Sequence, residues 1–263
     1  MRGRVLIIAG SDSGGGAGIQ ADIKTVSMLE AYAATAITAL TAQNTEGVFG
    51  VLAIPPDFVR RQIEVVLDDI GADAIKTGML HDLPVIKTIA ATLRDRAAHV
   101  PLVVDPVMVA KGGARLIDPA ALDGLKQLLI TRAEIVTPNL PEAEILCGRI
   151  IGNVAEMRLA GEALLALGCR SVLVKGGHLT GDTVSDVLVT PAGARVWESP
   201  RIATRHTHGT GCTFASAIAA SLAQGFTVED SVGRARDYVQ RAIAGAPGFG
   251  RGHGPLNHSH PLL

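Results

Sequence analysis

The stretch VLIIAGSDSGGGAGIQ (residues 5–20) decides the fold class, because an apolar run passes into a glycine-rich turn and then into a helical pattern. The apolar part, residues 5–9, has the length of a buried strand and is too short for a membrane span or a secretory leader. The glycines do not fit G-x-G-x-x-G, and G-x-x-x-x-G-K-[ST] is absent from the chain. The stretch therefore predicts the first strand and helix of an α/β protein that lacks both common nucleotide-binding fingerprints.

The alternation of short β-branched runs with helical periods continues along the chain. Apolar residues recur with helical spacing at residues 19–29 and 59–70. Further strands are predicted at residues 36–41, 74–78, 101–105, 134–137 and 171–175. This order is typical of a parallel sheet with crossover helices. With no linker, repeat or charge run, we expect one α/β domain over residues 1–263.

Two later segments have clear local signals. Asn153 and Glu156 predict a capping box at the start of a helix that runs to about Gly168. Residues 184–190 and 195–198 flank Pro191-Ala192-Gly193 and predict a hairpin. The hairpin interrupts the alternation of strands and helices late in the chain.

Composition restricts the partners. The formal net charge of the 263 residues is -1 and no block of Lys and Arg occurs, which disfavours a nucleic-acid or membrane surface and favours small molecules. Cys147, Cys169 and Cys212 show no paired spacing, so a disulfide framework is disfavoured. Together with the missing leader pattern, this indicates a reducing compartment, and we expect a cytoplasmic protein.

Polar residues and glycines follow several predicted strands, where ligands bind in sheets of this class. They are Gly10-Ser11-Asp12, Gln43-Asn44, Gly78-Met79, Asp105-Pro106, Pro138-Asn139 and Lys175-Gly176-Gly177. The loop from Gly10 to Gly18 offers backbone amides to an anionic or polar ligand, or is an ordinary turn between strand and helix. Asp22 borders the buried face of the helix that follows, where it either binds a ligand or complements the helix dipole.

A second glycine turn, THGTGCT (residues 207–213), precedes a helix predicted at residues 214–223. Amides of Gly209, Thr210 and Gly211 at this helix start would form an anion hole for a transferring phosphoryl group. Cys212 would have a lowered pKa there if it is exposed, whereas a buried, inert cysteine is the alternative. His206 and His208 lie nearby, but the cysteines form no C-x-x-C pair and a zinc site is disfavoured.

Four further residues at strand ends suit a nucleotide and its metal. Asp105, Asn139, Glu142 and Lys175 are candidates for Mg²⁺ and the triphosphate of ATP. Each alone is equally compatible with capping a neighbouring helix. As a set with the anion hole, they predict a small-molecule kinase.

Long motifs in this chain resemble those of the hydroxymethylpyrimidine/phosphomethylpyrimidine kinases of thiamine biosynthesis, within the ribokinase-like superfamily. The motifs are AGSDSGGGAGIQADIKT, TALTAQNTEGV, KTGML, VVDPVMVAKGG, TPNLPEAEIL, VLVKGGH, THGTGCT and GHGPLNHSH. They run nearly end to end. The resemblance implies a three-layer α/β/α fold with a mostly parallel sheet, a homodimer, and two successive phosphorylations of 4-amino-5-hydroxymethyl-2-methylpyrimidine by ATP.

The resemblance also implies roles for individual residues. Those expected to line the aminopyrimidine pocket are Gly10, Asp22, Gln43, Met79 and Val107. Asp105 and Glu142 would organise Mg²⁺, and Lys175 would balance phosphate charge. Nucleotide contacts are expected from Asn139, Lys175, Gly177 and Thr207. Cys212 would be the base or orienter of the substrate hydroxyl, at a position where many related sugar kinases have aspartate.

Some alternatives remain open at this level. Gly14 and His206 replace the serine and asparagine that are frequent in the family. A pyridoxal or pyridoxine kinase is the nearest alternative, since that ring also carries a hydroxymethyl group, and a non-catalytic vitamin- or nucleotide-binding module is another. Residues 44–56 and 109–117 contain Gly or Pro and are candidates for a moving lid.

Overall fold

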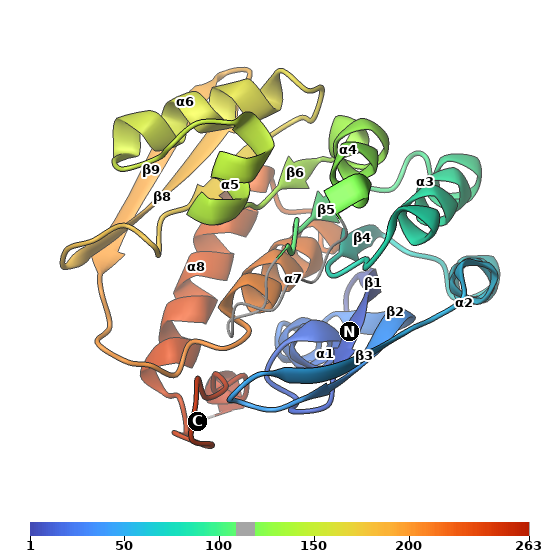
Figure 1. Cartoon of the computed structure of the whole chain (residues 1–263), viewed down its shortest axis with the longest axis horizontal. Coiled ribbons are helices and arrows are strands. Elements are labelled where there is room, and N and C mark those ends of the chain that lie inside the picture. Colours follow the sequence, from blue (N-terminus) through green and yellow to red (C-terminus); the bar gives the residue numbers. More distant parts are fainter. Residues whose placement is uncertain (109–118, 263) are drawn as a thin grey trace.

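The computed structural model describes residues 1–108 and 119–262 (Figure 1). Within these residues the strands form one nine-stranded sheet in the order β3-β2-β1-β4-β5-β6-β7-β8-β9. The strands are β1 (Arg4–Asp12), β2 (Tyr32–Gln43), β3 (Val48–Ala53), β4 (Ala74–Thr77), β5 (Leu102–Val104), β6 (Ile135–Val136), β7 (Val172–Lys175), β8 (Thr183–Thr190) and β9 (Gly193–Pro200). From β2 to β7 neighbouring strands are parallel, whereas β3, β8 and β9 pair antiparallel. The sheet is therefore mostly parallel, as the sequence predicts.

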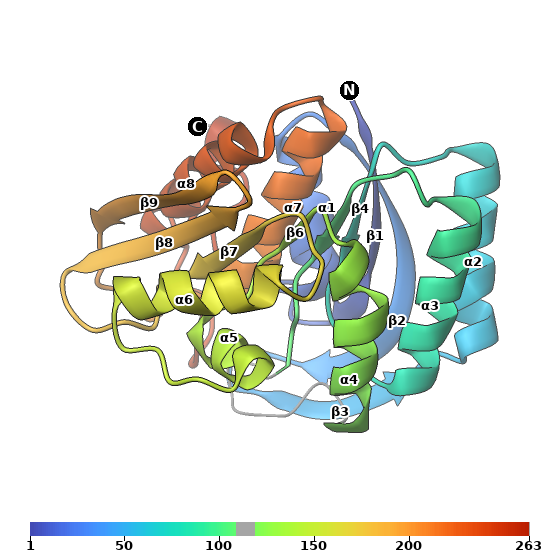
Figure 2. The same ribbon diagram turned by 90° about the horizontal axis from the view of Figure 1, so that it is seen from above.

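Helices cover both faces of the sheet. They are α1 (Gly18–Met28), α2 (Pro56–Asp69), α3 (Leu83–Arg96), α4 (Pro119–Leu128), α5 (Leu140–Cys147), α6 (Val154–Leu165), α7 (Thr210–Ala223) and α8 (Val228–Ala244), with short 3-10 helices η1 (Ile130–Arg132) and η2 (His260–Leu262). Figures 1 and 2 show α1, α7 and α8 on one face and α2 to α6 on the other. The predicted three-layer α/β/α class is confirmed.

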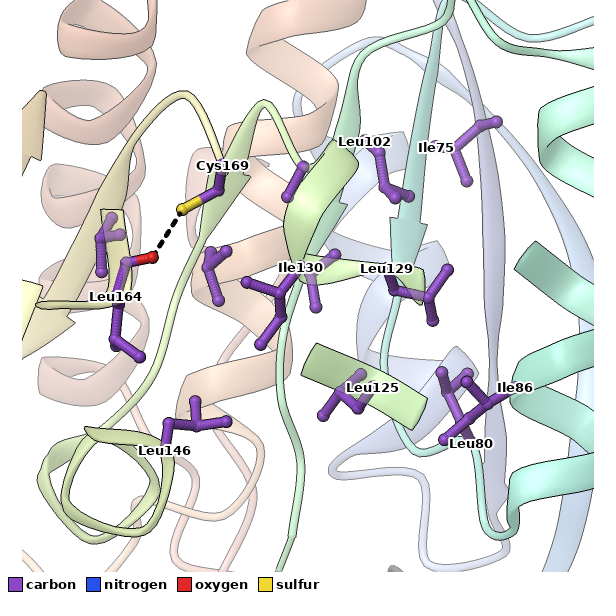
Figure 3. Close-up of a cluster of buried hydrophobic side chains, with 14 of the residues drawn as sticks. Ile75, Leu80, Ile86, Leu102, Leu125, Leu129, Ile130, Leu146, Leu164 and Cys169 are labelled. Atoms are coloured by element: carbon purple, nitrogen blue, oxygen red, sulfur yellow. Dashed lines mark hydrogen bonds between the residues drawn. The ribbon is translucent and has the colours of Figure 1, made fainter. Parts of the chain in front are cut away.

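Each face of the sheet has its own hydrophobic core. On one face Val5 and Ile7 of β1 pack with α7 and α8, and on the other Leu6 and Ile8 pack with α2 and α3. Helical cover on both sides explains why the central strands are apolar throughout rather than alternating. Figure 3 shows the second core, where the Cys169 thiol donates to the Leu164 carbonyl at 3.4 Å. Burial raises the pKa of this thiol to about 11.

The local predictions meet two corrections. Residues 48–53, which the sequence does not predict as a strand, form β3 paired with β2. The lid role of residues 44–56 stays a prediction, and residues 109–117 lie outside the described residues. At α6 only half of the predicted capping box forms, because the Asn153 side chain accepts from the Glu156 amide but Glu156 accepts from Gly152. The Glu156 carboxylate therefore accepts from the amide of Gly152 instead of the expected amide of Asn153. The predicted strands and the hairpin β8–β9 are otherwise confirmed.

Candidate active site

The two glycine turns meet at the carboxyl edge of the sheet. Gly209, with φ +83°, lies just before α7, and a Cβ on it would come within 1.8 Å of the Gly16 carbonyl oxygen. Gly18, with φ +54°, starts α1, and a Cβ there would lie 2.5 Å from the Gly10 carbonyl oxygen. Side chains are thus excluded at both positions. The turns pack backbone against backbone and bring the N-termini of α1 and α7 together.

The turn before α7 is held by the hydroxyl of Thr210 and by residues near the C-terminus. Thr210 Oγ1 donates to the Thr207 carbonyl at 2.7 Å, and the His208 amide donates to the Gly254 carbonyl at 3.1 Å. Thr213 Oγ1 lies 2.9 Å from Nε2 of His258, whose pKa burial lowers to about 4. The first amides of a helix have no acceptor within the helix. A fixed helix start of this kind can bind an anion.

Lys175 and Asp105 form an ion pair directly beneath this turn, which we call the open pair. Lys175 Nζ lies 3.0 Å from Asp105 Oδ1, which also accepts from Thr137 Oγ1 at 3.0 Å. A Cβ on Gly211 would lie 3.3 Å from Lys175 Nζ. Since Gly211 has no side chain, the ammonium is next to the turn. Lys175 keeps 11% of its side chain exposed, so the open pair is not fully enclosed.

Glu142 lies close to the open pair and also caps a helix. Its carboxylate accepts from the Asn139 amide at 2.8 Å, and Asn139 Oδ1 accepts from the Glu142 amide at 3.0 Å, so α5 has a complete capping box. Burial raises the pKa of Glu142 to about 7, with Lys175 acting in the opposite direction. Asn139 and Glu142 therefore both cap α5, which the sequence offers as the alternative to ligand binding. Their roles towards metal and nucleotide stay predictions.

A second ion pair, Asp22 with Lys76, is enclosed completely, and we call it the closed pair. Both side chains are 0% exposed, and Lys76 Nζ lies 2.9 and 3.0 Å from the two Asp22 oxygens. Ser216 Oγ of α7 donates to Asp22 Oδ1 at 2.7 Å. Burial raises the pKa of Asp22, opposed by Lys76. The substrate contact predicted for Asp22 stays a prediction, because this carboxylate already binds protein groups on both oxygens.

Cys212 lies between the two glycine turns, above the closed pair. The thiol is half-buried, and its sulfur accepts from the Gly18 amide. Burial raises its pKa to about 12, while the charge of Lys76 acts to lower it. The lowered pKa expected for an exposed thiol at this helix start is therefore not found, because protein surrounds the sulfur.

The other predicted pocket residues lie along the same edge. A Cβ on Gly10 would come within 3.0 Å of Met79 Sδ, so these residues are in contact. Gln43 Nε2 lies 3.4 Å from Nε2 of His208, and Val107 is half-buried after β5. The structure thus places four of the five at the carboxyl ends of β1, β2, β4 and β5, and Asp22 beneath them.

The remaining nucleotide candidates differ in accessibility. Gly177 is exposed, with open space where a Cβ would be, and its carbonyl accepts from the Arg201 guanidinium at 2.9 Å. Thr207 is half-buried, and its carbonyl accepts from the Thr210 hydroxyl. Space beside Gly177 leaves room for a ligand there.

Sequence reasoning missed Lys76, and it missed the pairing of Asp12 with His208, although it named both residues in the two glycine turns. Lys76 had a signal, since a lysine within a buried strand must have a partner. Asp12 and His208 pair at 2.8 Å between Nε2 and Oδ2. Burial acts to raise the pKa of Asp12, but His208 and the Ala17 and Gly14 amides lower it below its usual value. Nothing in the sequence connects these two residues, because they lie 196 positions apart.

Comparisons with known proteins agree on one family. Residues 12–257 match the sequence pattern of the phosphomethylpyrimidine kinases. The chain is 54% identical over 98% of its length to the thiamine biosynthesis bifunctional protein ThiED of Geobacter sulfurreducens, of which it spans about half, 52%. It is 45% identical to the hydroxymethylpyrimidine/phosphomethylpyrimidine kinase of Bacillus subtilis, covering 97% of this chain and 94% of that protein. The pyridoxal kinase of Bacillus subtilis in complex with ADP superposes with a TM-score of 0.92 over 100% of both chains at 37% identity.

Proposed function

The chain belongs to the phosphomethylpyrimidine kinase family, and from that premise we propose that it phosphorylates 4-amino-5-hydroxymethyl-2-methylpyrimidine and then its monophosphate with ATP. The protein is a phosphotransferase of thiamine biosynthesis. The observation that carries the proposal is the convergence of two helix N-termini, Cys212 and the open pair at one edge of the sheet.

The geometry divides the work of phosphoryl transfer among nearby groups. Amides of Gly209, Thr210 and Gly211 at the start of α7 stabilise charge on the transferring phosphoryl group. Lys175 balances phosphate charge from below the turn. Cys212 orients the hydroxyl group of the substrate or accepts its proton. Because phosphoryl transfer has a loose transition state, positioning and charge supply most of the rate.

Magnesium fits Asp105 of the open pair together with its neighbour Glu142. Asp105 acts to raise the pKa of Glu142, and both carboxylates act on the charge of Lys175. Among residues 1–108 and 119–262, no three His, Cys, Asp or Glu side chains converge as a metal cluster. That suits Mg²⁺, which proteins typically bind through one or two carboxylates together with substrate phosphates and water. We infer that Asp105 and Glu142 hold the ion, which would neutralise phosphate charge.

Assembly and location follow from the same premise. Strand β3 is exposed, with Phe49 71% and Leu52 64% accessible, and such a surface favours a homodimer over a monomer. The three cysteines are free, which favours the reducing cytoplasm. In the described part of the chain, no helix has the length and apolarity to cross a membrane.

A pyridoxal kinase is the second candidate, favoured by the superposition with the Bacillus subtilis enzyme. Purified protein with Mg-ATP is offered the hydroxymethylpyrimidine or pyridoxal in parallel, and ADP release is measured for both. We expect the higher kcat/KM with the pyrimidine, and Cys212→Ala to lower its kcat by about two orders of magnitude or more. Higher kcat/KM with pyridoxal would overturn the proposed substrate, and near-normal turnover of Cys212→Ala would remove the thiol from the mechanism.

A further inference from the structure

A buried histidine side chain joins the two glycine turns. His208 belongs to the turn before α7, residues 207–213, and Asp12 to the turn before α1, residues 10–18. Only 8% of His208 and 3% of Asp12 are exposed, and Nε2 of the histidine lies 2.8 Å from Oδ2 of the carboxylate. Because an ionised carboxylate only accepts hydrogen bonds, Nε2 carries the hydrogen and donates it. The imidazole therefore bridges the loop next to the predicted pyrimidine pocket and the turn that offers amides to phosphate.

Asp12 does not need this histidine to shape its own turn. Its Oδ1 accepts from the Gly14 amide at 2.8 Å, and its Oδ2 accepts from the amides of Ala17 and Gly16 at 2.8 and 3.2 Å. These three bonds are local and fix the first turn. The bond from His208 differs, because it comes from a segment 196 positions away. What it adds is the placement of one turn relative to the other.

His208 is also held through its backbone and the edge of its ring. Its amide donates to the Gly254 carbonyl at 3.1 Å, and the residue pairs with Pro255 in an isolated parallel bridge. A Cβ on Gly16 would lie 2.5 Å from Cδ2 of the imidazole, so the ring lies against the backbone of the first turn. Since Gly209 follows directly, a displacement of His208 would displace the amides at the start of α7.

The link lies between the groups that have to meet during the reaction. Nε2 of Gln43, a residue predicted for the pyrimidine pocket, lies 3.4 Å from Nε2 of His208, and the anion-binding amides of residues 209–211 follow along the chain. A hydroxyl oxygen and the phosphorus that it attacks must approach to about 3–3.5 Å, and a misplacement of about 1 Å can lower the rate about 10²-fold. The spacing of the two turns therefore controls the rate of phosphoryl transfer.

We propose that His208 and Asp12 are positioning residues, whose hydrogen bond holds the anion-binding turn at the correct distance from the substrate turn during phosphoryl transfer. This inference deepens the proposed function and rests on it. The imidazole keeps its proton throughout and acts through the turn rather than on the substrate. Loss of the bond should lower kcat and leave both KM values nearly unchanged, because each turn keeps its own binding groups.

Three substitutions of His208 test the role of its hydrogen bond. The Gln side chain in His208→Gln can place an N–H near the position of Nε2, whereas His208→Asn is too short and His208→Leu has no donor. The variants should fold, because Asp12 keeps its three amide donors. We expect kcat with Mg-ATP and the pyrimidine to fall about 10²-fold in His208→Leu and His208→Asn, with little change in either KM.

The comparison between these variants decides the proposal. His208→Gln should recover most of the lost kcat, and His99→Leu, the same change at an exposed histidine, should keep the kcat of wild type. Equal kcat values in His208→Gln and His208→Leu would overturn the proposal, since a purely structural role does not depend on the donor. A wild-type kcat in His208→Leu would overturn it as well.

Amide hydrogen exchange tests the link without substrate. In wild type the amide of His208 is bonded to the Gly254 carbonyl, and that of Thr213 is bonded to the Gly209 carbonyl at 2.9 Å. We expect both amides to exchange faster in His208→Leu, while the amides that Asp12 binds keep their protection. Unchanged exchange in this turn would overturn the proposal. Wild-type protein that phosphorylates no pyrimidine would contradict the proposed function alone, and the exchange result would still decide whether the bond holds the turn.

Discussion

The closed pair and the open pair have the same chemistry but different surroundings. Asp22 and Lys76 are both 0% exposed and bind each other through both carboxylate oxygens, whereas Lys175 of the open pair keeps 11% of its side chain accessible and lies beside Gly211. The closed pair is held entirely by protein groups. A pair with one accessible face can exchange protein contacts for phosphate. Enclosure, rather than residue type, thus distinguishes the two pairs.

The largest expected effect is on stability. Lys76→Met leaves Asp22 buried without its cation, and we expect a loss of about 3–5 kcal/mol in the free energy of unfolding. Lys175→Met should cost less, because the open pair keeps some exposure to solvent whereas both side chains of the closed pair are 0% exposed. Urea unfolding of both variants, with Lys87→Met at an exposed lysine of α3 as control, measures the difference. Equal losses in the free energy of unfolding for Lys76→Met and Lys175→Met would contradict the distinction between the closed and the open pair.

The open pair, whose loss should cost less stability, should matter strongly for activity. Lys175→Met removes the cation next to the anion-binding turn, and we expect kcat to fall about 10²- to 10³-fold, the usual effect of losing one transition-state donor. The KM for the pyrimidine should change far less. Steady-state kinetics with each substrate varied in turn make the measurement, and an effect confined to the pyrimidine KM would reassign Lys175 to that pocket.

Two glycines give a finer comparison. In Gly78→Ala the new methyl group would lie 2.9 Å from Lys76 Nζ and 3.0 Å from the Ala9 Cβ, which cannot move, so we expect a loss of about 1–3 kcal/mol. In Gly211→Ala the neighbour is Lys175 Nζ at 3.3 Å, at the end of a side chain that can move. Thermal unfolding and turnover are measured for both. Gly211→Ala should lower turnover with little effect on stability, and the opposite pattern would contradict the assignment of open and closed.

The smallest effect concerns pH. Burial raises the pKa of Glu142 from 4.5 to about 7, so the folded state holds this proton more tightly than the unfolded state. The free energy of unfolding should therefore decrease as pH rises from about 4.5 to 7. Glu142→Gln should flatten that part of the curve. If Glu142 binds magnesium, its ionisation should raise activity through pH 7, and Glu142→Gln should remove that rise. Stability and activity profiles of the variant that run parallel to wild type would exclude Glu142 from both effects.

Sequence alone predicted the architecture well, because strand length and helical period reflect burial. β3 was missed since its side chains are mostly exposed and lack the apolar signal of a central strand. The glycine turns were found from local spacing. The link between Asp12 and His208, the enclosure of Lys76 and the raised pKa of Cys212 depend on contacts between distant segments, which no local pattern reports.

The same contrast explains why Asp22 was difficult to interpret from sequence. Its helical position indicates a buried face, but only the fold reveals that Lys76 and Ser216 bind its oxygens. Asp22 is enclosed together with Lys76, and its contact with the substrate stays a prediction.

The most direct test of the central claim is the mass of the product that wild-type protein forms from Mg-ATP and 4-amino-5-hydroxymethyl-2-methylpyrimidine. We predict one phosphoryl group added first and a second added to the monophosphate, with one ADP released for each. No phosphorylated pyrimidine, while pyridoxal is converted under the same conditions, would contradict the claim.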